Sequence, residues 1–162
     1  MCGSTYVTNL MSGPVTDAEL AICVGIIEKG EAVNVALAGS ELPKATAVAV
    51  TRLNGAIVGV GVIKRERLDY AEKISERAGF VFPAETLELG YVAVDQAHRG
   101  NGLSHALVAA LIANRNDALF ATTSSKQMKK VLCKAGFARG GDEWDGNNSR
   151  LSLWLHPARQ ST

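Results

Sequence analysis

The sequence predicts a mixed α/β fold, in which helices flank one β-sheet. Three observations carry this prediction. The dipeptide Asn54-Gly55 separates two segments rich in Val and Ile, the pattern of an antiparallel hairpin. Residues 87–114 then read as a strand, a glycine-containing loop and an apolar helix. A further strand, a helix and a closing pair of strands complete the order, which describes a mixed sheet.

The N-terminal part predicts one short strand and one helix. Tyr6–Leu10 is the strand candidate. Thr16 and Glu19 have the spacing of a capping box, and apolar residues follow at helical spacing until Gly30 ends the pattern. Ala32–Lys44 contains glycine, serine and proline, so no long element is expected there.

The middle part predicts the hairpin and an insertion. Ala45–Leu53 and Ala56–Lys64 are the two antiparallel strands. The polar insertion Arg65–Thr86 contains a helix over Asp69–Ala78, because apolar residues at positions 70, 74 and 78 share one face. Gly79 closes this helix.

Two strand–helix units come next. Leu87–Asp95 is a strand, and Leu103–Asn114 is a helix with leucines at positions 103, 107 and 111 on one stripe. Ala118–Thr123 is a brief buried strand, and Lys126–Ala135 is a helix that Gly136 ends.

Two final strands, Ala138–Trp144 and Ser149–His156, close the chain. In the second, leucines at 151, 153 and 155 alternate with Ser152 and Trp154, which predicts one buried face. No repeat or linker interrupts the chain, so residues 1–162 are expected to form a single domain.

Length and composition fit that expectation. A chain of 162 residues matches one domain, on a prior of roughly 150 residues each. Apolar residues make up 47% and charged residues 20%, as in ordinary globular proteins. The formal net charge is +1, so no basic field attracts nucleic acid. No apolar run approaches the ~20 residues of a bilayer span, and residues 1–5 lack a secretory signal. We therefore expect a cytoplasmic protein without a membrane or nucleic-acid partner.

The potential metal ligands do not form a pattern. The three cysteines, Cys2, Cys23 and Cys133, are widely spaced, and no Cys-x-x-Cys pair occurs. The three histidines, at 98, 105 and 156, do not fall at metal-ligand spacings. We expect free thiols and no metal.

The segment around Arg99-Gly100-Asn101-Gly102-Leu103-Ser104 carries the functional signal. Two glycines lie where the loop enters the helix, and glycine permits positive φ and close approach of a ligand. Successive N–H groups there, with the open first turn of the helix, make an anion site, and Arg99 adds a positive charge. A Walker A loop is absent, and the third glycine of a dinucleotide fingerprint is missing.

At these residues the sequence resembles the GNAT superfamily, the acetyl-CoA-dependent N-acyltransferases. The family signature Arg/Gln-x-x-Gly-x-Gly/Ala after a strand is similar to residues 99–104, with Ser104 in place of Gly or Ala. The segment ending in Gly136-Phe137 looks like the family's helix end, and the order of elements matches over nearly the whole chain. The resemblance implies a mostly antiparallel sheet of about six or seven strands, with splayed central parallel strands.

The resemblance also implies roles for site residues. The main chain of Val92, Ala93 and Val94 would pair with the pantetheine arm of acetyl-CoA, and the Val92 N–H would serve as the oxyanion donor. The pyrophosphate would lie against residues 99–105, that is Arg99, Gly100, Asn101, Gly102, Leu103, Ser104 and His105. The strand Ala118–Thr123 would diverge and leave a slot for the thioester.

One departure concerns the general acid. The family often has a Tyr four residues before the helix-ending Gly, and this sequence has Leu132 there. Leucine cannot protonate the departing thiolate, so another group or a water must do so. Ser124, Ser125 and Cys133 are the nearby alternatives.

Glu88 is the candidate general base. An alkylamine of pKa about 10.4 is almost fully protonated at pH 7, so its attack requires a base. In some family members a Glu lies four residues before the oxyanion-donor position, which places it at Glu88 by that resemblance. The role requires a pKa raised from about 4.3 toward 6 or 7 by burial. The alternative is a strand-end Glu that faces solvent or pairs with a Lys.

The acceptor stays open. Acidic side chains around Trp144, at positions 142, 143 and 145, would suit a cationic amine, but they also fit a solvated turn. Arg65 and Arg67 would instead form a basic lid that favours an anionic acceptor. The leading hypothesis is acetyl transfer by direct attack to a primary amine of a small molecule, peptide or protein in a ternary complex. The alternative is a non-catalytic acyl-CoA-binding sensor, and the resemblance is compatible with a homodimer.

Overall fold

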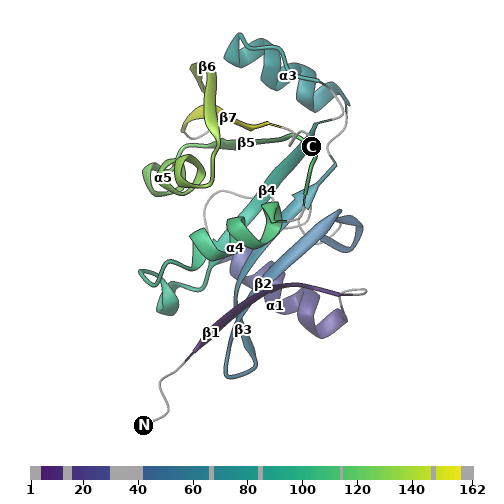
Figure 1. The fold of residues 1–162 in the computed structure, drawn as a ribbon, viewed down its shortest axis with the longest axis vertical. Coiled ribbons are helices and arrows are strands. Elements are labelled where there is room, and N and C mark those ends of the chain that lie inside the picture. Colours follow the sequence, from purple (N-terminus) through teal and green to yellow (C-terminus); the bar gives the residue numbers. More distant parts are fainter. Residues whose placement is uncertain are drawn as a thin grey trace. The chain divides into compact units, whose positions relative to one another are not determined.

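A computed structural model describes residues 5–12, 16–29, 42–65, 68–83, 86–113, 115–146 and 149–157. The strands are β1 (Tyr6–Leu10), β2 (Ala47–Leu53), β3 (Ala56–Lys64), β4 (Leu87–Val94), β5 (Leu119–Thr123), β6 (Ala138–Asp145) and β7 (Arg150–His156). The helices are α1 (Asp17–Lys29), α3 (Leu68–Ala78), α4 (Leu103–Ile112) and α5 (Lys126–Lys134), with 3₁₀ turns η1 (Leu42–Lys44) and η2 (Gln96–His98). Figure 1 shows these elements along the chain.

The strands form a seven-stranded sheet in the order β1-β2-β3-β4-β5-β7-β6. The recorded pairings are antiparallel except β4 with β5, which is parallel. The mixed, mostly antiparallel α/β fold predicted from the sequence is confirmed. The chain divides into two compact units, Met1–Ile63 with Tyr91–Ala113, and Lys64–Gly90 with Asn114–Thr162. The expectation of a single domain stays a prediction, and each unit is described by itself.

The first unit is built on the hairpin of β2 and β3. Asn54 and Gly55 have φ of 53° and 85°, the left-handed pair that a two-residue hairpin turn requires. The capping box is confirmed, because the Glu19 amide donates to the Thr16 hydroxyl and the Thr16 amide to the Glu19 carboxylate, each at 3.1 Å. The predicted end of this helix, at Gly30, lies outside the described residues.

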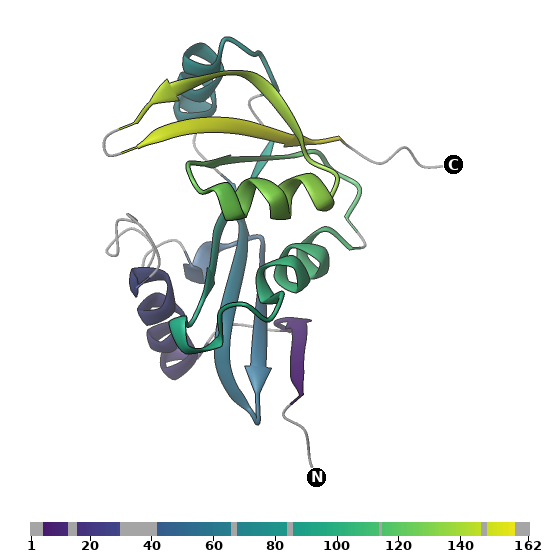
Figure 2. The same cartoon turned by 90° about the vertical axis from the view of Figure 1, so that its left-hand side faces the viewer.

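Two helices cover the strands of the first unit. Residues of α1 pack with both hairpin strands and Tyr91 in a buried cluster that includes Cys23, Ile27, Val50 and Val60. Leucine side chains of α4 meet the glycines of β3, since a Cβ at Gly61 would lie 2.9 Å from Leu111. Figure 2 shows α1 and α4 on opposite sides of these strands.

The second unit packs α3 and α5 against β5, β6 and β7. Trp144 of β6 lies in a buried cluster with Ile74 of α3, Phe120 and Leu153. The adjacent residue, Glu143, pairs with Lys129 of α5 at 3.2 Å. Because neighbouring side chains of a strand point to opposite faces, α3 and α5 cover opposite faces of this part of the sheet (Figure 2).

One detail of the last strand corrects the prediction. Leu153 is fully buried as expected, but Ser152 is also fully buried. Its hydroxyl donates to the Thr123 carbonyl at 3.2 Å and accepts from the Trp154 indole N–H at 2.9 Å. The prediction that only one face of this strand is buried is therefore wrong at Ser152. The hydroxyl can be buried because both of its hydrogen bonds are made within the protein.

Candidate cofactor site

The loop between β4 and α4 depends on two glycines. Gly100 and Gly102 have φ of 86° and 73°, in the region that side chains with a Cβ rarely adopt. A Cβ at either position would have no heavy atom within 4 Å. The backbone conformation, and not crowding, is therefore what requires glycine here.

The first turn of α4 presents its amides without a side-chain cap. Gly102 is the N-cap residue, no side-chain cap is formed, and no acidic residue lies in the first turn. The Ala106 amide donates to the Gly102 carbonyl at 3.2 Å, which is the first hydrogen bond of the helix. The amides of Leu103, Ser104 and His105 come before it and therefore have no acceptor within the helix. An N-terminus of this kind attracts a phosphate by its N–H groups and its dipole.

The first half of the loop is held by its own residues. The Asp95 carboxylate accepts from the Ala97 amide at 3.0 Å, and the Asp95 carbonyl accepts from the His98 amide at 2.9 Å. Arg99 is exposed, and its Nε donates to the Val94 carbonyl at 3.4 Å. Its guanidinium therefore lies beside the loop.

The second half is held by the side chain of Asn101, which also contacts Tyr6, a residue that the sequence did not indicate. The Asn101 side chain donates to the His98 carbonyl at 2.9 Å and to the Tyr6 hydroxyl at 3.4 Å. The Tyr6 hydroxyl also lies 3.1 Å from Nδ1 of His98. Tyr6 is 92 positions away from His98 and belongs to no motif, so no sequence signal points to it.

The backbone of β4 offers one edge in the first unit. The carbonyl oxygens of Tyr91 and Ala93 lie next to Gly61 and Gly59 of β3, and the Asp95 amide donates to the Val58 carbonyl at 2.8 Å. Because backbone groups alternate along a strand, those of Val92 and Val94 point away from β3. This edge is the one that the predicted pantetheine contacts require.

The recorded register of β4 with β5 covers only Leu87 with Leu119 and Glu88 with Phe120. The slot expected for the thioester stays a prediction. The same holds for the cofactor roles of residues 92–94 and 99–105.

Glu88 is buried in the second unit and does not face solvent. Its carboxylate lies 3.8 Å from the ammonium of Lys64, and the two side chains are 8% and 11% exposed. The stem of Lys64 crosses Gly90, where a Cβ would lie 2.6 Å from Lys64 Cε. The solvent-facing alternative is wrong, and the Lys-paired alternative is what the structure contains. Burial and the ammonium oppose each other, since burial disfavours the carboxylate and the positive charge favours it.

Two residues near the missing general acid, Leu132 and Ser125, have structural roles in the second unit. Leu132 is 0% exposed, so it belongs to the core of the second unit. The Ser125 hydroxyl caps α5 by accepting from the Met128 amide at 3.2 Å. Cys133 is a free, exposed cysteine.

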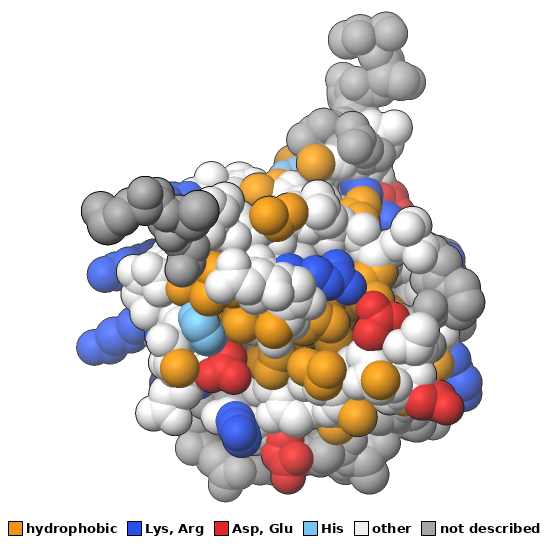
Figure 3. Space-filling view, turned by 90° about the horizontal axis from the view of Figure 1, so that it is seen from below, with side chains coloured by type: hydrophobic (Ala, Val, Ile, Leu, Met, Phe, Trp, Pro, Cys, Tyr) orange, Lys and Arg blue, Asp and Glu red, His pale blue; other side chains and the backbone are white. Residues whose placement is uncertain are grey.

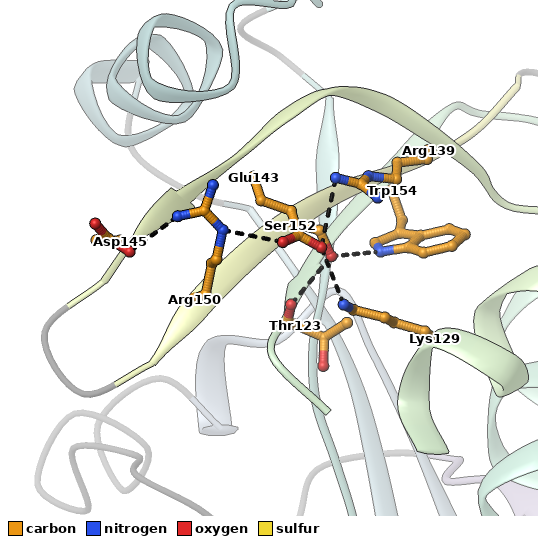
Figure 4. Close-up of polar contacts among 8 residues, drawn as sticks. All are labelled: Thr123, Lys129, Arg139, Glu143, Asp145, Arg150, Ser152 and Trp154. Atoms are coloured by element: carbon orange, nitrogen blue, oxygen red, sulfur yellow. Dashed lines mark hydrogen bonds and ion pairs between the residues drawn. The ribbon is translucent and has the colours of Figure 1, made fainter. Parts of the chain in front are cut away.

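The acidic residues near Trp144 do not form an open cluster. Trp144 is 8% exposed and packs in the core, so its indole does not support the alternative of a cationic amine held beside it. Glu143 lies 3.1–3.4 Å from basic side chains of Lys129, Arg139 and Arg150, and Asp145 also pairs with Arg150. Figure 4 shows three basic side chains around this carboxylate. The hydrogen bond from Lys129 is the largest cause of a lowered pKa at Glu143.

The two arginines that would form a basic lid for an anionic acceptor are only partly described by the structure. Arg65 is exposed, and Arg67 lies outside the described residues. The structure therefore leaves a basic lid as a prediction.

An apolar cavity of about 360 Å³ lies in the second unit, lined by residues that include Phe80, Phe82, Leu155 and His156. None of the predicted site residues lines it.

Single hydrophobic side chains are exposed elsewhere, with Val7 and Ile22 about half exposed and Val81 90% exposed. Figure 3 shows hydrophobic side chains gathered in the middle of one face, among acidic and basic ones. The homodimer stays a prediction.

The described residues contain no group of three or more His, Cys, Asp or Glu side chains that could hold a metal ion. Among them, no helix combines the length and apolar character that crossing a bilayer requires.

Solved structures show the same fold. The histone acetyltransferase HPA2 and related acetyltransferase from Corynebacterium glutamicum is 19% identical, with a TM-score of 0.70 over 96% of this chain and 98% of that chain. A GNAT family acetyltransferase from Streptococcus agalactiae is 14% identical, with a TM-score of 0.72 over 94% and 96%. A GNAT family acetyltransferase from Elizabethkingia anophelis with acetyl-CoA bound is 14% identical, with a TM-score of 0.59 over 94% and 97%. At such identities the likeness shows the fold alone.

The sequence itself identifies the family. No curated protein matches the chain. The model of the Acetyltransferase (GNAT) family matches residues 28–131, which is more than half of the chain and includes the loop with Gly100 and Gly102. The chain therefore belongs to the GNAT acetyltransferase family.

Proposed function

We propose that this protein transfers an acetyl group from acetyl-CoA to a primary amine of a small molecule or peptide. Membership of the GNAT family implies acyl transfer from acetyl-CoA. The observation that carries the proposal is the amide-lined turn into α4, with left-handed Gly100 and Gly102 and an N-terminus free of a side-chain cap.

In the proposed complex, the pyrophosphate lies against the main chain from Arg99 to His105. The pantetheine arm pairs with the edge of β4 at residues 92–94. This assignment is supported by the alternation along β4, which turns the backbone groups of Val92 and Val94 away from β3. Two amides in the pantetheine arm match that edge as an added strand would.

The proposed chemistry is direct attack. The amine nitrogen bonds to the thioester carbon, and the carbonyl oxygen becomes an oxyanion that accepts a hydrogen bond from the Val92 amide. The oxyanion then reforms the carbonyl as the carbon–sulfur bond breaks, and CoA leaves as a thiolate. The proton lost by the amine passes through a water to the carboxylate of Glu88. The thiolate takes a proton from water, and the hydroxide formed takes the proton held by Glu88, so that no net acid or base remains.

A binding and turnover experiment tests the proposal. Calorimetry should detect acetyl-CoA binding, and an acceptor panel should release free thiol with at least one member. The panel spans polyamines, amino acids, aminoglycosides and peptides. Absence of acetyl-CoA binding at millimolar concentration would end the proposal.

The Glu88→Gln variant tests the base. It keeps the shape of the side chain but cannot accept the proton, so kcat/KM should fall by roughly 10²-fold or more. The pH dependence of the remaining rate should change as well. Glu72→Gln, on the exposed side of α3, is the matched control and should behave as the native protein. An unchanged rate and pH profile in Glu88→Gln would exclude Glu88 as the base.

A second candidate is a non-catalytic acyl-CoA-binding module. The observation that favours it is Leu132, which is fully buried and provides no hydroxyl to protonate the thiolate. Tight acetyl-CoA binding without thiol release across the whole panel would support this candidate over transfer.

A further inference from the structure

Tyr6 links the start of β1 to the loop that enters α4. Its hydroxyl lies 3.1 Å from His98 Nδ1 and 3.4 Å from the Asn101 amide nitrogen. The Tyr6 and His98 rings also meet edge to face, with centroids 5.8 Å apart and an interplanar angle of 83°. One side chain thus contacts the loop on both sides of Arg99 and Gly100.

The loop needs such a support because of its glycines. Gly100 and Gly102 have many accessible conformations, and an anion is bound well only when successive N–H groups converge. Ordering these residues at the moment of binding would lower affinity. A loop that is already held before the ligand arrives avoids this loss.

The contacts within the loop hold mainly its first half. The hydrogen bonds of Asp95 to the amides of Ala97 and His98 fix residues 95–98. The Asn101 side chain fixes the second half of the loop to the first, because it donates hydrogen bonds to the His98 carbonyl and to the Tyr6 hydroxyl. Asn101 therefore contributes its backbone to the predicted anion site, while its side chain is used inside the protein.

We propose that Tyr6 is a positioning residue for the pyrophosphate of acetyl-CoA. It acts through His98 and Asn101, which hold the amides around Gly100 and Gly102 in the anion-binding arrangement. This inference rests on the proposed function, because it concerns the site that binds the pyrophosphate of the same cosubstrate.

The test compares Tyr6→Phe with Thr8→Val. Tyr6→Phe removes the hydroxyl and keeps the ring contact with His98. Thr8→Val is the matched control, because it removes another β1 hydroxyl, bonded to Thr51 at 2.7 Å and not to the loop. The dissociation constant of acetyl-CoA should rise about 3- to 10-fold in Tyr6→Phe, as expected for loss of a neutral hydrogen bond. It should stay unchanged in Thr8→Val.

The second arm separates positioning from a general loss of structure. S-Acetylpantetheine lacks the pyrophosphate, so its dissociation constant, measured by NMR titration, should be the same in the native protein and in Tyr6→Phe. Hydrogen exchange of the amides of residues 100–104 should be faster in Tyr6→Phe than in Thr8→Val.

The outcomes are distinct. If the native protein binds no acetyl-CoA, the proposed function fails. If it binds acetyl-CoA and Tyr6→Phe binds equally well, only the role of Tyr6 is wrong. Equal weakening for acetyl-CoA and S-acetylpantetheine would also overturn it, because the effect would then not concern the pyrophosphate.

Discussion

At Gly102 the backbone enters α4 with φ of 73°, and a Cβ would meet no atom within 4 Å. A side chain there is disfavoured by its own backbone and not by its neighbours. The left-handed conformation of Gly102 therefore turns the chain into α4 and leaves the amides of the first helical turn without a side-chain cap.

Gly102→Ala should cost about 1–2 kcal/mol of unfolding free energy and weaken acetyl-CoA binding. Gly25→Ala is the control, because Gly25 lies inside α1 with open space around a Cβ. That variant should gain about 0.5–1 kcal/mol. Urea unfolding and calorimetric titration measure both quantities, and a neutral Gly102→Ala would contradict the argument.

Lys64 and Glu88 show how burial changes the meaning of an ion pair. Both side chains are about nine-tenths buried, so loss of one partner leaves a charge in a poorly hydrated place. A surface pair of the same length would contribute little.

Lys64→Met should destabilise the protein by roughly 3 kcal/mol, because the Glu88 carboxylate loses its neighbouring ammonium. Adding Glu88→Leu should restore most of that loss. Lys73→Met, on the exposed side of α3, should change stability by no more than about 0.5 kcal/mol. Thermal unfolding checks all three, and a double variant as unstable as Lys64→Met alone would argue against the pair.

Glu143 joins three elements of the second unit. Its carboxylate pairs with Lys129 of α5, with Arg139 on its own strand and with Arg150 of β7. Figure 4 shows these side chains converging from the helix and the two strands. The hydrogen bond from Lys129 comes first among the causes that lower the pKa of Glu143 below its ordinary value of 4.5.

The sign of the pH effect follows from this direction. A carboxyl group whose pKa is lower in the folded state than in the unfolded state stabilises the folded protein. This contribution is fully present at a pH above the unfolded-state pKa, and it is lost as the pH falls through the folded-state pKa. Native protein and Glu143→Gln should therefore differ in urea midpoint at pH 7, and the difference should shrink as the pH is lowered below 4.5. Asp142→Asn, an exposed neighbour on β6, is the control. A difference that persists unchanged at low pH would contradict the prediction.

Among the described residues, each unit contains a buried cluster, one around α1 and one around α3. Cys23 lies in the first cluster and is 0% exposed, while Cys133 is exposed on α5. Burial, the largest cause, raises the pKa of Cys23 to about 11.

Cys23 should therefore resist alkylation at pH 8 in the folded protein, whereas Cys133 should react. Peptide mass spectrometry after iodoacetamide treatment measures each site, and denaturant should make both reactive. Acetyl-CoA should slow any reaction of Cys23 that proceeds through unfolding, because a ligand that binds the folded state stabilises it. Fast labelling of Cys23 in native protein would contradict this burial.

Much of the fold was predictable because its signals are local. The turn at Asn54 and Gly55 and the capping box at Thr16 need only neighbours in sequence. The strand and helix boundaries agree within a few residues for the same reason, as at β4, which ends at Val94 and not Asp95. The positive φ at Gly100 and Gly102 was also implied by residue type alone.

The sequence by itself determined the order of elements and the amide-rich turn, since hydrogen-bond and φ preferences act over a few residues. Only the tertiary structure decided that Glu88 pairs with Lys64, that Trp144 and Ser152 are buried, and that Tyr6 supports the loop. These contacts join residues far apart in the chain. They depend on strand register and helix packing, which set the side chains that meet.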